Sequence, residues 1–111
     1  MIVRKAEDVP ANTVADGAEN VTIQWLIAKS EGAENFYMRQ LNLDPNGSTP
    51  HHSHDWEHEV YVLSGSGKLV SESESYDLEP GMVCFVPGGD VHHFETSDDS
   101  MSFLCLIPSE K

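Results

Sequence analysis

Three histidines that fall within seven residues are the first feature of this sequence that could do chemistry. They are His52, His54 and His58 in the segment HHSHDWEH, and a run of residues typical of a β-strand follows them. Neutral imidazole is the commonest metal-binding side chain in proteins. A lone histidine is more often an ordinary surface or core residue, but three at this spacing indicate a metal site.

The spacing of these histidines predicts where they point. Residues two apart on a β-strand lie on the same face, so His52 and His54 would project to one side. In the strand predicted next, His58 shares its face with Val60 and Val62. Because two valines favour burial, His58 is expected to point inward.

A distant segment, GMVCFVPGGDVH, supplies a further imidazole. Its Pro-Gly-Gly sequence predicts a tight turn, and His92 would begin the strand that follows, with Phe94 on the same face. A ligand from a second segment is expected, since one pair of strands cannot surround an ion. The neighbouring His51 and His93 fall on the opposite face by strand parity and are predicted not to bind the metal.

The elements that position these residues read as short strands throughout the chain. Turn residues separate runs that are rich in β-branched and aromatic residues, and no segment is suited to a crossover helix of about a dozen residues. Eight to ten strands in one domain spanning residues 1–111 predict an all-β sandwich or barrel. The expected strands lie at about 21–28, 35–43, 57–63, 68–74, 75–78, 82–86, 91–95 and 101–107, with a turn at 44–47.

Charge and composition exclude several classes of protein. With 19 acidic against six basic residues, the formal net charge is −13, which argues against binding to nucleic acid or to anionic membranes. No apolar segment is long enough to span a membrane, and the first residues, MIVRKAEDVP, contain no apolar stretch typical of a secretory signal, so none is expected. Cys84 and Cys105 lie in apolar runs and are expected to be reduced, so a cytoplasmic location is predicted.

A rival metal motif overlaps the first cluster. The segment from His54 to His58 matches the inverted zincin pattern H-x-x-E-H, in which both histidines lie on one face of a helix. Pro50 precedes this segment and the β-like, glycine-interrupted run VYVLSGSG follows it, so a helix is not expected here.

The two histidine segments together resemble the two motifs of the cupin superfamily. The first motif is reproduced by the spacing of His52, His54 and His58 and by six residues leading to Gly65. The second is matched by a glycine, a Pro-x-Gly turn and a histidine: Gly81, Pro87, Gly89 and His92. The motifs occupy about residues 47–65 and 81–96, and the resemblance implies a single-domain jelly-roll β-barrel.

The departures from the family pattern bear on the ligands. Gly47 is one residue too close to His52, and Thr96 replaces the asparagine of the second motif. His58 stands where the family usually has glutamate. Glu59 could take that role, but it would lie only five residues before Gly65 and on the other strand face.

The segments NFYMR, HSHDWEHE and FLCLIP are similar to those of small single-domain manganese cupins. That resemblance implies a homodimer and one divalent metal ion per chain, with manganese favoured. Imidazole also suits Fe, Zn, Cu and Ni, so these ions are alternatives to manganese. The implied ligands are His52, His54, His58 and His92.

Four neutral ligands would leave the charge of the ion uncompensated and two octahedral positions open, which favours chemistry on a small molecule that binds through two oxygens. The expected function is therefore a metal-dependent enzyme, with oxygenase-like redox chemistry. A non-catalytic module that binds or senses a small ligand is one alternative, and a closed structural metal site is another. The candidate pocket walls are Tyr37, Arg39, Trp56, Phe94, Phe103 and Cys105.

Overall fold

The structure, a computed structural model, describes residues 1–14 and 17–109 and is built almost entirely of β-strands. Two single-turn 3₁₀ helices, η1 (Ala6–Asp8) and η2 (Lys29–Glu31), are the only helices in these residues, and neither could cross a membrane. The strands are β1 (Asn12–Thr13), β2 (Glu19–Ile27), β3 (Phe36–Ser48), β4 (His58–Gly65), β5 (Gly67–Ser71), β6 (Ser75–Leu78), β7 (Val83–Val86), β8 (His92–Glu95) and β9 (Met101–Pro108).

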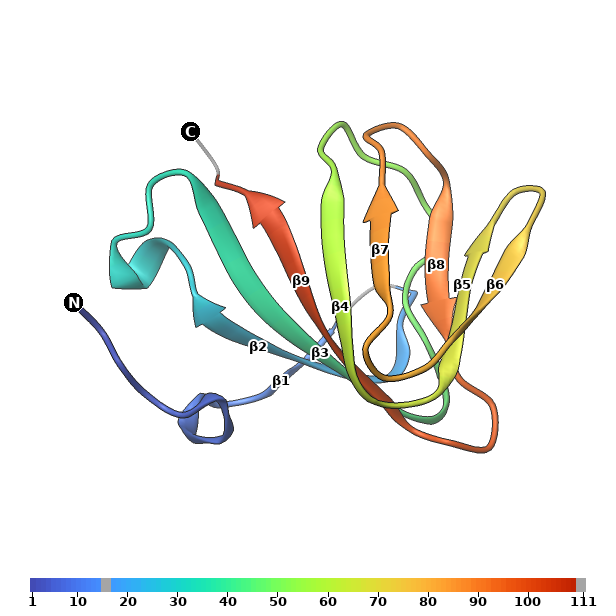
Figure 1. The fold of residues 1–111 in the computed structure, drawn as a ribbon, viewed down its shortest axis with the longest axis horizontal. Helices are drawn as coiled ribbons and strands as arrows, with labels where there is room; N and C mark the ends of the chain where they lie inside the picture. Colours follow the sequence, from blue (N-terminus) through green and yellow to red (C-terminus); the bar gives the residue numbers. More distant parts are fainter. Residues whose placement is uncertain (15–16, 110–111) are drawn as a thin grey trace.

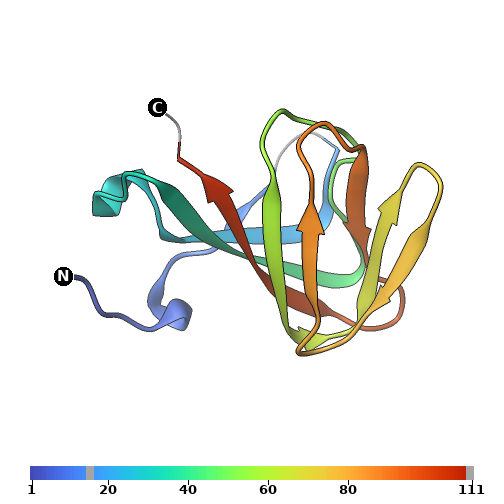
Figure 2. The same ribbon diagram turned by 45° about the horizontal axis from the view of Figure 1, so that its top comes forward.

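The strands form one antiparallel sheet that curls into a barrel. Their order is β6-β5-β8-β3-β9-β4-β7, with β2 paired to β3 and β1 to β2. Figures 1 and 2 show the two ends of this sheet, the β5–β6 hairpin and β7, turning toward each other. The predicted all-β cupin-type jelly-roll architecture is confirmed.

The core lies inside the curl and follows the alternation of the sequence. On β4, His58, Val60 and Val62 are buried, whereas Tyr61 and Leu63 face outward. The largest fully buried side chains come from β3, β4 and β9: Phe103, Leu43, Met101 and Val62. The prediction that His58 shares an inward face with two valines is therefore confirmed.

The turn expected at 44–47 is instead a bulge within β3. Glu19 pairs with Ser48 and Val21 with Leu43, so residues 44–47 lie opposite a single residue, Asn20. Asn20 and Asn46 adopt left-handed backbone conformations, with φ of 52° and 58°, which asparagine tolerates better than most residues. The turn-forming residues thus bend the strand without ending it, because pairing resumes at Ser48.

A second difference concerns the first two histidines, which were expected on a strand. His52 forms one isolated bridge with His92, and residues 53–57 are loop. Pro50 lacks a backbone N–H, which disfavours a regular strand here. Because residues 53–57 are not held in a strand, the chain can turn here and place His54 beside His58 at the start of β4.

Gly65 at the end of β4 is required by the packing. Its φ is +75°, and a Cβ built there would lie 1.8 Å from the carbonyl oxygen of Ser100. Only glycine allows this close approach of β4 to the start of β9, which explains the position of the last residue of the first motif.

Candidate metal centre

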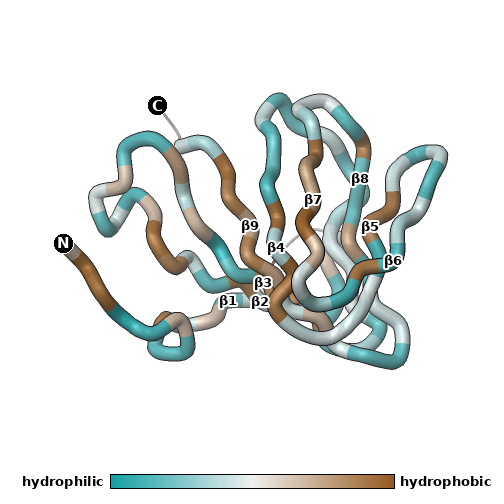
Figure 3. Tube along the Cα trace, viewed as in Figure 1, coloured by the Kyte–Doolittle hydropathy of each residue, from teal (hydrophilic) through white to brown (hydrophobic). Residues whose placement is uncertain are grey.

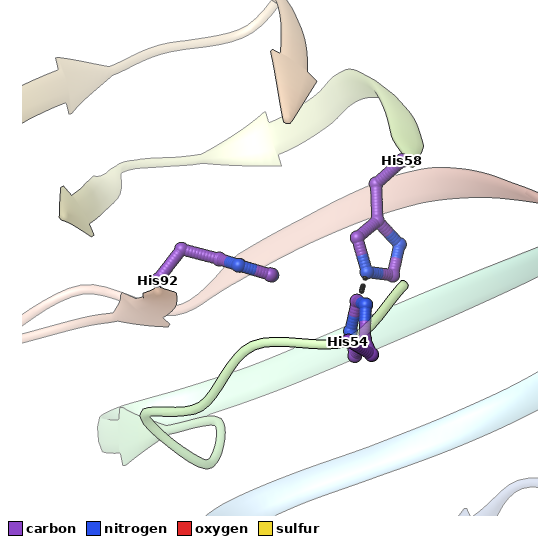
Figure 4. A group of neighbouring side chains, drawn as sticks. All are labelled: His54, His58 and His92. Carbon is purple, nitrogen blue, oxygen red and sulfur yellow. Dashed lines mark hydrogen bonds between the residues drawn. The ribbon is translucent and has the colours of Figure 1, made fainter. Parts of the chain in front are cut away.

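Three imidazole rings converge on one point inside the barrel (Figure 4). One nitrogen each of His54, His58 and His92 lies within 4.8 Å of the others, and the Nε2 atoms of His54 and His58 are 2.8 Å apart. Nitrogens bound at ~2.1 Å to one ion at right angles would be ~3 Å apart, so this spacing suits a shared metal.

Backbone hydrogen bonds tie the two histidine segments together. The N–H of His52 donates to the carbonyl of His92 at 3.2 Å, and the N–H of His92 donates to the carbonyl of His52 at 3.1 Å. The N–H of Gly89, in the turn before β8, donates to the carbonyl of His54 at 2.7 Å. The two segments, distant in sequence, are thereby held as one unit.

Backbone carbonyls select the tautomers of two of the histidines. His54 Nδ1 lies 3.3 Å from the carbonyl oxygen of Trp56, and His92 Nδ1 lies 2.9 Å from that of Asp90. A carbonyl oxygen only accepts hydrogen bonds, so each Nδ1 carries the proton. The Nε2 lone pair is then free for a metal, an arrangement typical of metal-binding histidines.

The third histidine is oriented by side chains. His58 Nδ1 lies 3.2 Å from Cys105 Sγ, and an Arg39 nitrogen donates to the same sulfur at 2.9 Å. If Nδ1–H of His58 donates to this sulfur, Nε2 again presents a lone pair toward His54. Arg39 pairs with Cys105 in the register of β3 and β9, which accounts for their contact.

Burial keeps all three imidazoles neutral. Loss of hydration lowers the pKa of His54 and His92 and is the largest cause at both residues. At His58, burial, the Arg39 charge and the neighbouring histidines lower the pKa to about 3. Neutral imidazole is the form that binds metal, so the cluster offers its lone pairs at neutral pH.

His52 lies beside this group without being one of the three converging residues. Its ring centroid is 5.1 Å from that of His54 and 6.3 Å from that of His92. It lines the same cavity as the three. Glu59, the alternative ligand, is exposed and faces away from the core.

The cluster opens into a cavity of about 350 Å³. Of the predicted pocket residues, Arg39, Phe94, Phe103 and Cys105 line it. Tyr37 is buried against the edge of Trp25, outside this lining.

Trp56 stands beside the cluster and is 47% exposed. Its ring stacks on His54, with centroids 4.4 Å apart and planes 3° from parallel. It therefore supports His54 from outside the cavity lining.

The two remaining histidines pair with each other. His51 Nδ1 and His93 Nδ1 are 2.5 Å apart, and His93 Nε2 lies 2.8 Å from a carboxylate oxygen of Glu95. Their contacts therefore place them apart from the converging nitrogens.

The cupin domain family matches residues 39–107, which include both histidine segments and most of the barrel. The chain belongs to the cupin family.

The solved structure of the polyketide cyclase RemF from Streptomyces resistomycificus is similar over nearly the whole chain. The two are 38% identical with a TM-score of 0.95, covering 99% of this chain and 80% of RemF. The oxalate-binding protein of Thermotoga maritima is 29% identical over 113 residues, covering 96% of this chain and 93% of that protein.

A third relative is the transcriptional activator RhaS of Escherichia fergusonii, 38% identical over 55 residues. The match covers half of this chain but only 20% of RhaS, so it concerns a shared segment.

No sequence pattern indicates which carbonyl oxygens orient His54 and His92. Every residue carries a carbonyl, and only the loop conformation decides which one meets an imidazole. Gly88 is a related case, since a Cβ there would lie 2.3 Å from the carbonyl oxygen of Asp55. This close packing of the turn against the histidine loop became visible only in three dimensions.

Proposed function

We propose that this cupin is a metal-dependent enzyme that acts on a small polycarbonyl compound, and that its reaction is a ring closure of the polyketide cyclase type. The observation that carries the proposal is the convergence of three neutral imidazole nitrogens on a cavity of about 350 Å³. The likeness to RemF over nearly the full length supports the reaction class.

We infer that one divalent ion binds per chain, with His52 as the fourth ligand beside the three converging residues. Support comes from the position of His52 on the cavity wall and from its backbone bridge to His92. Manganese stays the favoured ion, and iron, zinc, copper and nickel stay alternatives, because imidazole suits several of these metals. When bound, the ion would supply Lewis-acid polarisation of carbonyl oxygens.

The substrate class is inferred from the wall of the cavity. None of the residues that line it within the described chain is aspartate or glutamate, so it offers no carboxylate base. A polyketide carries carbons flanked by two carbonyls, whose protons are unusually acidic and need only a weak base. Such a compound also presents two oxygens at the spacing of a bidentate ligand.

The chain's own residues would orient this substrate and keep water out. The rings of Phe94 and Phe103 pack 4.5 Å apart between centroids and line the cavity. Leu41, also in the lining, adds an aliphatic wall. Apolar walls strengthen electrostatic interactions inside the cavity, because they lower its effective dielectric constant.

A second candidate function is the binding of a small dicarboxylate without turnover. The 29% identity to an oxalate-binding protein over nearly the whole chain favours it. Oxalate, like a β-dicarbonyl, offers two neighbouring oxygens, so both candidates use the same site.

The test is to load the protein with manganese or zinc and incubate it with a linear tetraketide thioester, with and without dioxygen. The proposal predicts a product in which a bond forms between C2 and the C7 carbonyl carbon and one water is lost, in equal amounts in both atmospheres. His58→Ala should abolish it, while the matched His93→Ala, outside the cluster, should not. A product that gains oxygen only in air would instead support an oxygenase, and binding without product would support the binding module.

We also propose that two copies of the chain associate through the outer face of β4 and β7. Tyr61, Val83 and Phe85 are 48%, 72% and 59% exposed there. They line an apolar groove together with Leu104 and Leu106 of β9. Figure 3 shows the hydrophobic stretches of β7 and β9. An exposed apolar face of this kind is typical of protein–protein contacts.

A further inference from the structure

Arg39 is a cation in the wall of the metal cavity. Its guanidinium donates to Cys105 Sγ at 2.9 Å and lies 3.4 Å from His58 Nδ1. Its central carbon lies 5.5 Å from the centre of the Trp25 ring, in a cation–π contact. The Nε atom of Arg39 is buried and has no hydrogen-bond partner within the described chain.

No carboxylate among the described residues neutralises this guanidinium. Other basic side chains do form ion pairs, such as Arg4 with Glu31 at 3.4 Å and Lys68 with Asp77 at 3.4 Å, but Arg39 forms none. The chain carries 19 acidic residues, yet none of those described lines this cavity. Arg39 is partly buried, and a partly desolvated cation without a carboxylate partner in the described chain favours an anion bound beside it.

We propose that Arg39 is the anion-recognising residue of this cavity and that the ligand carries a negatively charged oxygen, as a carboxylate or an enolate. This inference rests on the proposed function, since it names the ligand class of the same site. A single imidazole, that of His58, separates the guanidinium from the nitrogen that faces His54. A ligand with two oxygens can therefore meet the metal-binding cluster and Arg39 together.

The electrostatics favour this ligand over a neutral one. A divalent ion held by neutral imidazoles keeps its full charge, and the guanidinium adds another positive charge beside it. Arginine presents its N–H groups in a planar fork that matches the two oxygens of a carboxylate. The buried Nε–H has no hydrogen-bond partner in the described chain, so the protein itself does not fully satisfy this guanidinium.

The test measures anion binding by calorimetry in the metal-loaded protein, with three probes. Oxalate is the carboxylate probe, acetylacetone is the enolate probe, and oxamide is a neutral compound of similar shape to oxalate. Arg39→Met should weaken binding of each charged probe, oxalate and the enolate, about tenfold to hundredfold, which corresponds to the loss of one charge-assisted hydrogen bond. Its affinity for oxamide should be unchanged. Arg39→Lys should lose less, because it keeps the charge without the fork. Which probe binds more tightly tells a carboxylate ligand from an enolate.

Arg4→Met is the matched control, because it removes the same charge far from the cavity and should leave all three affinities unchanged. Circular dichroism and metal content establish that each variant is folded and loaded, and Arg39→Lys keeps the test open if Arg39→Met does not fold. Equal affinity of the Arg39→Met and Arg4→Met proteins for both charged probes would overturn the inference. So would a wild-type protein that binds oxamide as tightly as oxalate, or that binds neither charged probe.

Failure of the proposed function would be seen separately. If the protein binds no metal, the same titrations on the metal-free protein report on Arg39 alone, and an Arg39-dependent affinity would leave the inference standing. If the charged probes bind in an Arg39-dependent way but no tetraketide is cyclised, the ring-closure proposal fails and the anion subsite remains.

Discussion

Replacing Cys105 by alanine should change both the stability of the fold and its affinity for metal. The buried sulfur accepts a hydrogen bond from Arg39 at 2.9 Å and lies 3.2 Å from His58 Nδ1. With the metal bound, His58 must carry its proton on Nδ1, and this sulfur is then the acceptor that holds the ring. Cys105→Ala removes both contacts without removing a proposed ligand.

The two contacts predict separate effects on stability and on metal affinity. In the metal-free protein, His58 can adopt the other tautomer, so Arg39 loses the sulfur but keeps His58 Nδ1, 3.4 Å away, as an acceptor. Loss of one hydrogen bond whose donor keeps another acceptor costs about 0.5–1.5 kcal/mol of unfolding free energy. Loss of a residue that orients a metal ligand typically weakens metal binding by about 10- to 100-fold, which is expected here in addition.

The assay combines chemical denaturation of the metal-free protein with competition against a chelator of known affinity. Cys105→Ser should recover part of the metal affinity, because a hydroxyl oxygen can accept the same bonds. Cys84→Ala is the matched control, since Cys84 is a partly buried cysteine on β7 that does not line the metal cavity. Metal affinity of Cys105→Ala equal to that of Cys84→Ala would refute the orienting role of the sulfur.

Three further predictions concern the metal ligands, the stability of the protein in acid and its oligomeric state. Alanine at any one proposed ligand should lower bound metal well below one ion per chain, while His51→Ala and His93→Ala retain it; the ligands are His52, His54, His58 and His92. Because folding lowers the pKa of His58 from 6.5 to about 3, its neutral form stabilises the fold fully above pH 6.5, and this contribution is lost as the pH falls toward 3. The unfolding free energy of the metal-free wild-type protein should therefore fall more steeply with acid than that of His58→Asn, with a difference in slope of less than about 1.4 kcal/mol per pH unit. Parallel pH curves for the two proteins would contradict this prediction. Tyr61→Asp combined with Phe85→Asp should convert a dimer to a monomer in light scattering without loss of metal; a wild-type monomer at micromolar concentration would refute the proposed assembly.

The strands and the inward histidine were predictable because alternation along a strand is local. His58, Val60 and Val62 alternate with outward residues, and the structure buries all three. The bulge at residues 44–47 was not predictable in this way, because Asn-Gly turn chemistry ends a strand in one context and bends it in another. Which of the two occurs depends on the pairing of Glu19 with Ser48 and of Val21 with Leu43, that is, on the register between β2 and β3 and not on the local sequence.

The same distinction between local and distant features applies to the residues around the candidate site. Motif spacing identified the histidines, because their ligand chemistry is carried by the side chain itself. It could not associate Arg39 with Cys105, which are 66 residues apart and meet only through the pairing of β3 with β9. That Arg39 has no carboxylate partner among the described residues was equally hidden, since it depends on where those acidic residues lie in the fold.

Anomalous diffraction from crystals grown with manganese would show whether the converging histidines hold one metal ion. One anomalous peak per chain is expected, bound by the Nε2 atoms of His54, His58 and His92, with His52 as the fourth protein ligand. At least one further position should be filled by solvent or a small anion. A peak held by carboxylate oxygens such as those of Glu57 or Glu59, or no peak in protein that binds manganese in solution, would contradict this expectation.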